Sequence, residues 1–250
     1  MAIDGASSGN LGRSPNEMAK AWIGGVAVEK TSALELPAAL KEVKDLVDEL
    51  DCSWKTFTAQ SIEKLVTLFP NLKRLKAEDT KVDAKCFQKM LGWKLLENLD
   101  LERSKGVNDN GLKYLAELPA LKVLRLKNCH ITDSELKILA TFPVLTDLNL
   151  ENNSAVTDGG ALFIPQFRAL QSLNLGMTEI TNKALEYISK SPSLVSLDLV
   201  ECVSIDDKGL ESLAKLVSLK RLNLHSRHRF SFTGLEHFQS KLPDCAIALH

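Results

Sequence analysis

The chain repeats one leucine motif, L-x-x-L-x-L, at an almost constant interval along most of its length. Six intact copies start 24 or 25 residues apart, at Leu96, Leu121, Leu145, Leu170, Leu194 and Leu219. Degenerate copies start at Val47 and Leu72, and CAIAL from Cys245 is the beginning of a ninth. Leucine therefore supplies 43 of the 250 residues. A unit this short cannot bury its own apolar face, so the spacing predicts units that stack and share one continuous core.

Each unit has the pattern of a short strand followed by a helix. The alternation of L-x-L predicts a strand, and apolar residues at helical spacing follow it, for example Leu136, Leu139 and Phe142. The Thr-Asp pair before these residues can cap the helix, and a proline such as Pro143 ends the unit before the next strand. Because helices are wider than strands, we expect a curved stack with parallel strands on its concave face and helices on its convex face.

The copy LKVLRLKNCHITDSEL, from Leu121, resembles the leucine-rich repeat superfamily in its ribonuclease-inhibitor-like or cysteine-containing form. The similarity extends over residues 47–250, which would hold about eight repeats and a terminal cap strand. It implies an α/β fold, namely a right-handed solenoid in the form of a horseshoe arc. It also implies a protein-binding function without catalytic residues or cofactors. Similar arrays occur in F-box substrate receptors and in many bacterial proteins.

One column of residues lies three positions after the last leucine of each strand. Six of its eight members are short side chains with a hydrogen-bond donor or acceptor, namely Thr80, Ser104, Cys129, Asn153, Thr178 and Cys202. A turn that folds inward buries main-chain N–H and C=O groups, and such side chains can satisfy them. We therefore interpret Cys129 and Cys202 as structural residues and not as reactive thiols. Lys55 and Arg227 interrupt the column, so we expect the first and last turns to depart from the repeat geometry.

The residues before the array differ from it in composition. Residues 1–31 are expected to form a flexible tail, because residues 1–20 are rich in glycine, serine and asparagine, with the apolar segment 21–28 partly docked on the first repeat. Residues 32–46 predict a capping helix that covers the end of the core with Leu36, Leu40 and Val43. A degenerate F-box in this region, or a secretion signal in the tail, is the functional alternative.

One repeat breaks the helical pattern. Gly159 and Gly160 stand at its helix start, and Pro165 stands where neighbouring repeats have alanine, so we expect a short or distorted helix. Variation that is tolerated on the convex side explains this feature. A hinge or a contact with a partner is the alternative.

The sequence contains no catalytic motif of the phosphate-loop, serine-hydrolase, zinc-protease or C-x-x-C type, and repeat positions account for all five cysteines. The net charge of −1 gives no general attraction to nucleic acid or to an anionic membrane. The longest N-terminal apolar stretch, residues 21–28, is too short to span a bilayer. We therefore expect a soluble, cytoplasmic monomer, or an effector delivered elsewhere, without enzymatic activity, cofactor or metal.

The concave face is the candidate binding site, because its residues alternate with the buried leucines. The residues selected as partner-binding are Arg74, Lys76, Asp100, Glu102, Arg103, Arg125, Lys127, Asp147, Asn149, Glu151, Asn174, Asp198, Arg221, Asn223 and His225. Trp54, just past the first strand, is a further candidate if it is exposed. Mixed charge fits a protein partner better than DNA, which would need a basic stripe. We predict a protein-binding scaffold; the alternatives are a substrate-recruiting subunit of a ubiquitin-ligase-like system and a bacterial effector.

Overall fold

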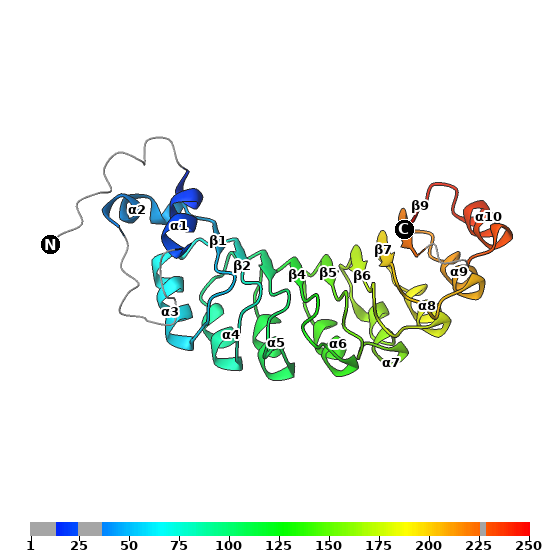
Figure 1. Ribbon diagram of the computed structural model, residues 1–250, viewed down its shortest axis with the longest axis horizontal. Coiled ribbons are helices and arrows are strands. Elements are labelled where there is room, and N and C mark those ends of the chain that lie inside the picture. The colour runs from blue at the N-terminus through cyan, green and yellow to red at the C-terminus, as the bar shows by residue number, and fades with distance from the viewer. Residues whose placement is uncertain (1–13, 25–36, 226–228) are drawn as a thin grey trace.

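The computed structural model describes residues 14–24, 37–225 and 229–250. Within them, nine short strands form one open sheet in which every neighbouring pair is parallel and the spatial order follows the sequence. The strands are β1 (Glu49–Asp51), β2 (Arg74–Lys76), β3 (Asn98–Asp100), β4 (Val123–Arg125), β5 (Asp147–Asn149), β6 (Ser172–Asn174), β7 (Ser196–Leu199), β8 (Arg221–Leu224) and β9 (Ala246–Leu249). Figure 1 shows them along the concave side of an arc, with helices on the outer side. The α/β repeat solenoid predicted from the leucine spacing is therefore confirmed.

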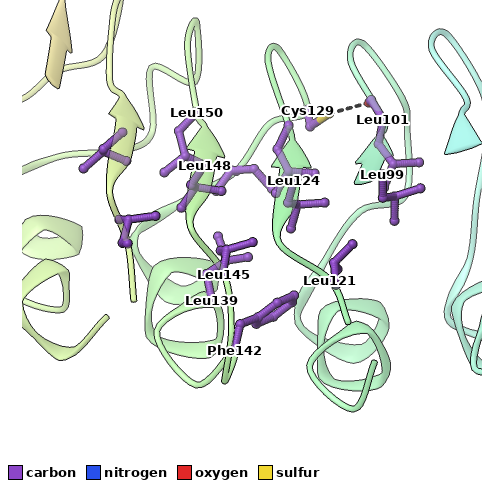
Figure 2. Close-up of a cluster of buried hydrophobic side chains, with 14 of the residues drawn as sticks. Leu99, Leu101, Leu121, Leu124, Cys129, Leu139, Phe142, Leu145, Leu148 and Leu150 are labelled. Carbon is purple, nitrogen blue, oxygen red and sulfur yellow. Dashed lines mark hydrogen bonds between the residues drawn. The ribbon is translucent and has the colours of Figure 1, made fainter. Parts of the chain in front are cut away.

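The leucines of the motif lie in register from strand to strand and form the core. Leu99 of β3 pairs with Leu124 of β4, and Leu124 pairs with Leu148 of β5. None of these three side chains is more than 2% exposed. Figure 2 shows them pointing into the space between strands and helices, where Leu145 and Phe142 also lie. One continuous core therefore runs through the array, as stacking of the units requires.

A helix follows each of β1 to β8 on the outer side. These helices are α3 (Ala59–Leu68), α4 (Ala84–Met90), α5 (Asp109–Leu115), α6 (Asp133–Leu139), α7 (Asp158–Ala161), α8 (Asn182–Ile188), α9 (Asp207–Leu213) and α10 (Phe232–Lys241). Thr132 and Thr157, each followed by aspartate, cap α6 and α7 as predicted, since each accepts a hydrogen bond from an N–H group in the first turn. The residue after the cap ties neighbouring repeats together. Asp133 accepts bonds from the main-chain N–H of Thr157 at 2.7 Å and from its hydroxyl at 2.6 Å.

The turns after the strands share one backbone conformation. A left-handed residue, with φ between 53° and 64°, occupies the same position in seven repeats: Trp54, Asp79, Arg103, Asn128, Asn152, Met177 and Glu201. The N–H of Trp54 donates to the carbonyl of Glu78 at 2.8 Å, as the N–H of Asn128 does to Glu151 at 2.9 Å. The departure predicted for the first turn is therefore wrong, because main-chain bonds close the turn whatever side chain stands at Lys55. Arg227 lies outside the described residues.

The two column cysteines satisfy buried carbonyl groups. The thiol of Cys129 donates to the carbonyl of Leu101 at 2.9 Å, a contact drawn in Figure 2. Cys202 donates in the same way to Leu175 at 3.0 Å. Both cysteines are at most 5% exposed. The structural role predicted for them agrees with these contacts.

A short helix, α1 (Pro15–Gly24), precedes the array, so the flexible tail predicted for residues 15–20 is wrong. Its side chains Ala19 and Ile23, four residues apart, are buried at the end of the core. The Asn16 side-chain oxygen accepts a bond from the N–H of Asp48 at 3.0 Å, beside β1. The helix forms because this apolar face has an exposed end of the array to cover.

The predicted capping helix is shorter than residues 32–46. It consists of α2 (Ala38–Val43) and a 3-10 turn, η2 (Lys44–Leu46). Leu40 is buried and Val43 packs against the core, as predicted, whereas Leu36 lies outside the described residues.

The irregular repeat has the short helix that its sequence predicts. α7 contains four residues, and a separate 3-10 turn, η3 (Ile164–Gln166), follows with Pro165 inside it. A Cβ atom at Gly160 would lie 2.6 Å from a carboxylate oxygen of Asp133, which explains the glycine.

No helix within the described ranges is long and apolar enough to cross a membrane.

Candidate functional site

Three rows of side chains cover the concave face, because the residues on either side of each buried leucine point away from the core. The strand register places one row through Arg74, Asp147 and Arg221. The middle row is Asp51, Lys76, Asp100, Arg125, Asn149, Asn174, Asp198 and Asn223. The third row follows the strands and contains Glu102, Lys127, Glu151 and His225. Arg103 belongs to none of the three rows, since it is the left-handed residue of the turn after β3.

Most of the acidic and amide residues in the middle row bind a main-chain N–H group at the end of their own strand. Each uses one side-chain oxygen to accept a bond of 2.8–3.1 Å from the N–H group two residues later; they are Asp51, Asp100, Asn149, Asn174 and Asp198. That N–H group follows the strand and needs an acceptor. These side chains therefore hold the strand ends, and the second polar atoms of Asn174 and Asp198 also bond within the chain, to Glu151 and from Asn223.

The N-terminal part of the face is an ion-pair network centred on Arg103 and Glu78. The Arg103 guanidinium contacts the carboxylates of Glu78 at 2.7 Å, Asp79 at 2.8 Å and Glu102 at 3.3 Å. The Lys76 ammonium lies 2.7 Å from the other oxygen of Glu78. Hydrogen bonds from Lys76 and then Arg103 hold the pKa of Glu78 below its ordinary value. The charges in this part of the face largely neutralise one another.

The pKa shifts of Glu102, within this network, and of Asp100, beside it, are opposite to that of Glu78. Burial raises the pKa of Asp100, and burial followed by the charges of Asp100 and Glu78 raises the pKa of Glu102. Farther along, the Lys127 ammonium contacts Glu151 at 2.6 Å, and the Asn174 amide donates to the same carboxylate at 3.3 Å. Glu78, Glu102, Lys127 and Glu151 of the third row are therefore all in ion pairs with other residues of the chain.

A hollow of about 280 Å³ lies on the concave face between β4 and β8. Its lining residues are Val123, Leu124, Arg125, Asp147, Leu148, Asn149, Ser172, Leu173, Asn174, Ser196, Asp198 and Asn223. Arg125 forms no ion pair with any residue in the described ranges, and its one hydrogen bond is a long contact of 3.5 Å to the Asn98 side chain. This guanidinium therefore keeps its donors for an incoming group.

The remaining predicted residues lie at the two ends of the face. Arg74 is paired with Asp48 at 2.9 Å and with Glu49 at 3.0 Å. At the other end, Asn223 donates to Asp198 at 2.7 Å, and Arg221 reaches the Ser196 hydroxyl at 3.4 Å. The imidazole of His225 lies 3.2 Å from Glu201. The predicted set is thus one continuous face but not one cluster.

The cysteines do not form a reactive site. Burial raises the pKa of Cys52 and of Cys129 to about 12, and that of Cys86 to about 11. Burial also raises the pKa of Cys202 and of Cys245. In the parts of the chain that the structure describes, no group of three His, Cys, Asp or Glu side chains could hold a metal ion.

Two residues of the hollow, Ser172 and Ser196, are absent from the predicted site. Their position beside the buried leucines indicates a concave location, but a small uncharged side chain gives no sequence signal for binding. Glu78, the centre of the ion-pair network, was missed because several acidic residues occupy equivalent positions. Trp54 is 74% exposed, which satisfies the condition for the further candidate at the rim.

The comparisons with known proteins agree with the repeat. A family model described as Leucine Rich repeat matches residues 190–214. The crystal structure of internalin C2 from Listeria monocytogenes matches with a TM-score of 0.61 and 22% identity, over 92% of this chain and 92% of that chain. The chain is a leucine-rich repeat protein by fold. Its ribonuclease-inhibitor-like subtype stays a prediction.

The chain is also similar to a chain in the crystal structure of the Rad7 and Elc1 complex in yeast. The identity is 14% and the TM-score 0.44, over 81% of this chain and 69% of that chain. No curated protein matches the sequence.

Proposed function

We propose that the protein is a non-enzymatic scaffold that binds a protein partner on its concave face, centred on the hollow between β4 and β8. One observation carries this proposal. Nearby basic residues, Lys76, Arg103 and Lys127, each contact a carboxylate of the chain itself, whereas Arg125 forms no such pair with the described residues. A half-buried guanidinium beside a hollow favours a carboxylate supplied by another molecule.

The chemistry of the hollow supports a protein as that molecule. Asn149 and Asn174 each commit one oxygen to the strand ends, and the small residues Ser172 and Ser196 leave room for an inserted side chain. Donors and acceptors alternate over a short distance, as in protein interfaces. A nucleic acid would instead need several unpaired basic residues in a stripe. We infer that an Asp or Glu side chain of the partner contacts Arg125.

Charge reversal at Arg125 tests the proposal. Arg125→Glu should weaken partner binding about tenfold or more, because it replaces attraction by repulsion at a partly desolvated site. The immobilised wild-type chain and the variant are exposed to extracts of the source cells, and retained proteins are compared by quantitative mass spectrometry. Lys183→Glu on α8 is the matched control, since Lys183 is exposed and lies on the convex side.

Lys127→Glu provides a second comparison. Lys127 already contacts Glu151, so its reversal should weaken binding less than reversal of Arg125. Partner proteins retained by the wild type and by Lys183→Glu, but lost with Arg125→Glu, support the proposal. Equal retention by all variants, with unchanged circular dichroism, contradicts it.

A further inference from the structure

A groove of about 540 Å³ lies along the solvent side of α6, on the convex side of the molecule. Its floor consists of Ser134, Lys137, Ile138 and Thr141, which are spaced as one face of a helix. Lys113 of α5 stands on one side and Phe163, between α7 and η3, on the other. The groove therefore follows the axis of α6 and lies outside the concave face.

The irregular repeat provides the open side of this groove. The helix α7 stops after four residues, and Pro165 directs the chain into a 3-10 turn. Phe163 and Ile138 are only partly buried, as are Tyr114 and Tyr187 at the same position of other repeats, and Leu162 beside Phe163 is 48% exposed. What distinguishes this repeat is an apolar residue, Leu162, at the exposed position where α5, α6 and α8 carry Lys113, Lys137 and Glu186.

The two charged residues that line the groove, Lys113 and Lys137, are both basic. Neither Lys113 nor Lys137 forms an ion pair with a residue in the described part of the chain, and both side chains are exposed. The equivalent positions of α8 and α9 carry Glu186 and Glu211, so this row of the convex surface is basic only at the groove.

We propose that this groove binds an acidic amphipathic helix of a protein partner, as a second contact separate from the concave face. Apolar side chains of that helix would cover Ile138 and Phe163, and its carboxylates would contact Lys113 and Lys137. The size of the groove lies within the range of about 300–1,000 Å³ that is typical of ligand sites in proteins.

Two peptides of about 15 residues, long enough to form helix, test this proposal. Both carry leucines at i, i+3, i+4 and i+7; one has glutamates and the other has lysines beside this stripe. Fluorescence anisotropy measures their binding to the full chain, and the methyl resonances of Ile138 report the location. We expect the acidic peptide to bind and to shift these resonances, and the basic peptide to bind at least about tenfold more weakly.

A charge exchange gives the decisive control. The double variant Lys113→Glu, Lys137→Glu should bind the basic peptide and lose the acidic one, which also shows that the variant is folded. Lys183→Glu, Lys208→Glu, on α8 and α9, is the matched control and should behave as the wild type. The Arg125→Glu variant should also bind the acidic peptide normally, so this test and that of the concave face are independent.

Four results would overturn the proposal. These are no saturable binding of the acidic peptide, equal binding of both peptides, binding without a shift of the Ile138 methyl resonances, and preservation of the preference in the double variant. Vesicles of phosphatidylserine and phosphatidylcholine test a membrane instead of a protein. Binding to these vesicles that depends on Lys113 and Lys137, without peptide binding, would assign the groove to lipid and contradict the proposal.

Discussion

The side-chain oxygen of Asn153 accepts a hydrogen bond of 3.0 Å from the main-chain N–H of Cys129, which lies one repeat earlier. The same oxygen accepts a second bond, of 2.9 Å, from Ile131. The Asn153 amide donates to the carbonyls of Leu126 at 2.9 Å and Leu150 at 2.8 Å. One buried side chain thus satisfies four main-chain groups across two repeats.

Asn153→Ala should therefore cost roughly 3–5 kcal/mol of the free energy of unfolding, because it leaves buried donors and acceptors without partners. Urea denaturation measures the change. The control is Ser154→Ala, at an exposed neighbouring position, which should change stability by less than about 0.5 kcal/mol. Similar small losses in both variants would refute the role of Asn153.

Leu148→Ala should destabilise the chain by roughly 2–5 kcal/mol, because it opens a cavity within the leucine core. Leu148 is 2% exposed, whereas Leu46 is 68% exposed and provides the matched leucine control. Leu46→Ala should cost less than about 0.5 kcal/mol in the same denaturation experiment. A loss below this value for Leu148→Ala would contradict the register of the repeat.

The five cysteines should resist alkylation in the folded chain. All five are buried, and burial holds the pKa of Cys52 and Cys129 at about 12, so the reactive thiolate is scarce at pH 8. Labelling with iodoacetamide followed by mass spectrometry should find little modification in buffer and modification of all five thiols in denaturant. Rapid labelling of Cys129 in the folded chain would exclude its structural role.

Glu78 should make stability depend on pH in the acid range. Its folded-state pKa lies below the ordinary value of 4.5, so the unfolded chain binds the proton more readily. Its stabilising contribution is therefore complete above about pH 5 and is lost as the pH falls through the folded-state pKa. The wild type should exceed Glu78→Gln in stability at pH 7, and this difference should shrink toward pH 3. A constant difference across this range would argue against the ion pairs with Lys76 and Arg103.

The sequence alone predicts the core because the buried leucine positions recur at an almost constant spacing. Leu99, Leu124 and Leu148 occupy equivalent positions in three successive repeats. If one of these positions is buried, the stacked repeats bury the other two as well. The same periodicity places Asn149 and Asn174 on the opposite, concave side. The short helix at Gly159 and Gly160 is also readable, since glycine and proline act locally.

The helix at the N-terminal end of the array was harder to predict, although the sequence contains a local signal for its start. The Ser14 N–H donates to the Glu17 carboxylate at 2.7 Å, while the Glu17 N–H donates to the Ser14 hydroxyl at 3.3 Å. This Ser-x-x-Glu capping box, with Pro15 at the first helical position, is the sequence pattern that predicts the start of α1. The glycine and serine residues just before it gave the segment the composition of a tail.

Pairing on the concave face could not be predicted from the sequence. The rows identify which long side chains are neighbours, but not which carboxylate each one contacts. Lys127 contacts Glu151 at 2.6 Å, whereas Arg125, two residues earlier, has only its long contact with Asn98 among the residues that the structure describes. That difference depends on side-chain conformation, which residue spacing does not determine.

Site-specific photo-crosslinking in the source cells tests the concave-face proposal most directly. A photoreactive amino acid replaces Ser172 or Ser196 inside the hollow, and Lys208 on α9 as the convex control away from the groove at α6. We expect one protein to crosslink from both serine positions, to be absent at Lys208, and to be lost when Arg125→Glu is added. Crosslinks to that protein from Lys208 alone, or crosslinks from the serine positions that persist with Arg125→Glu, would contradict the proposal.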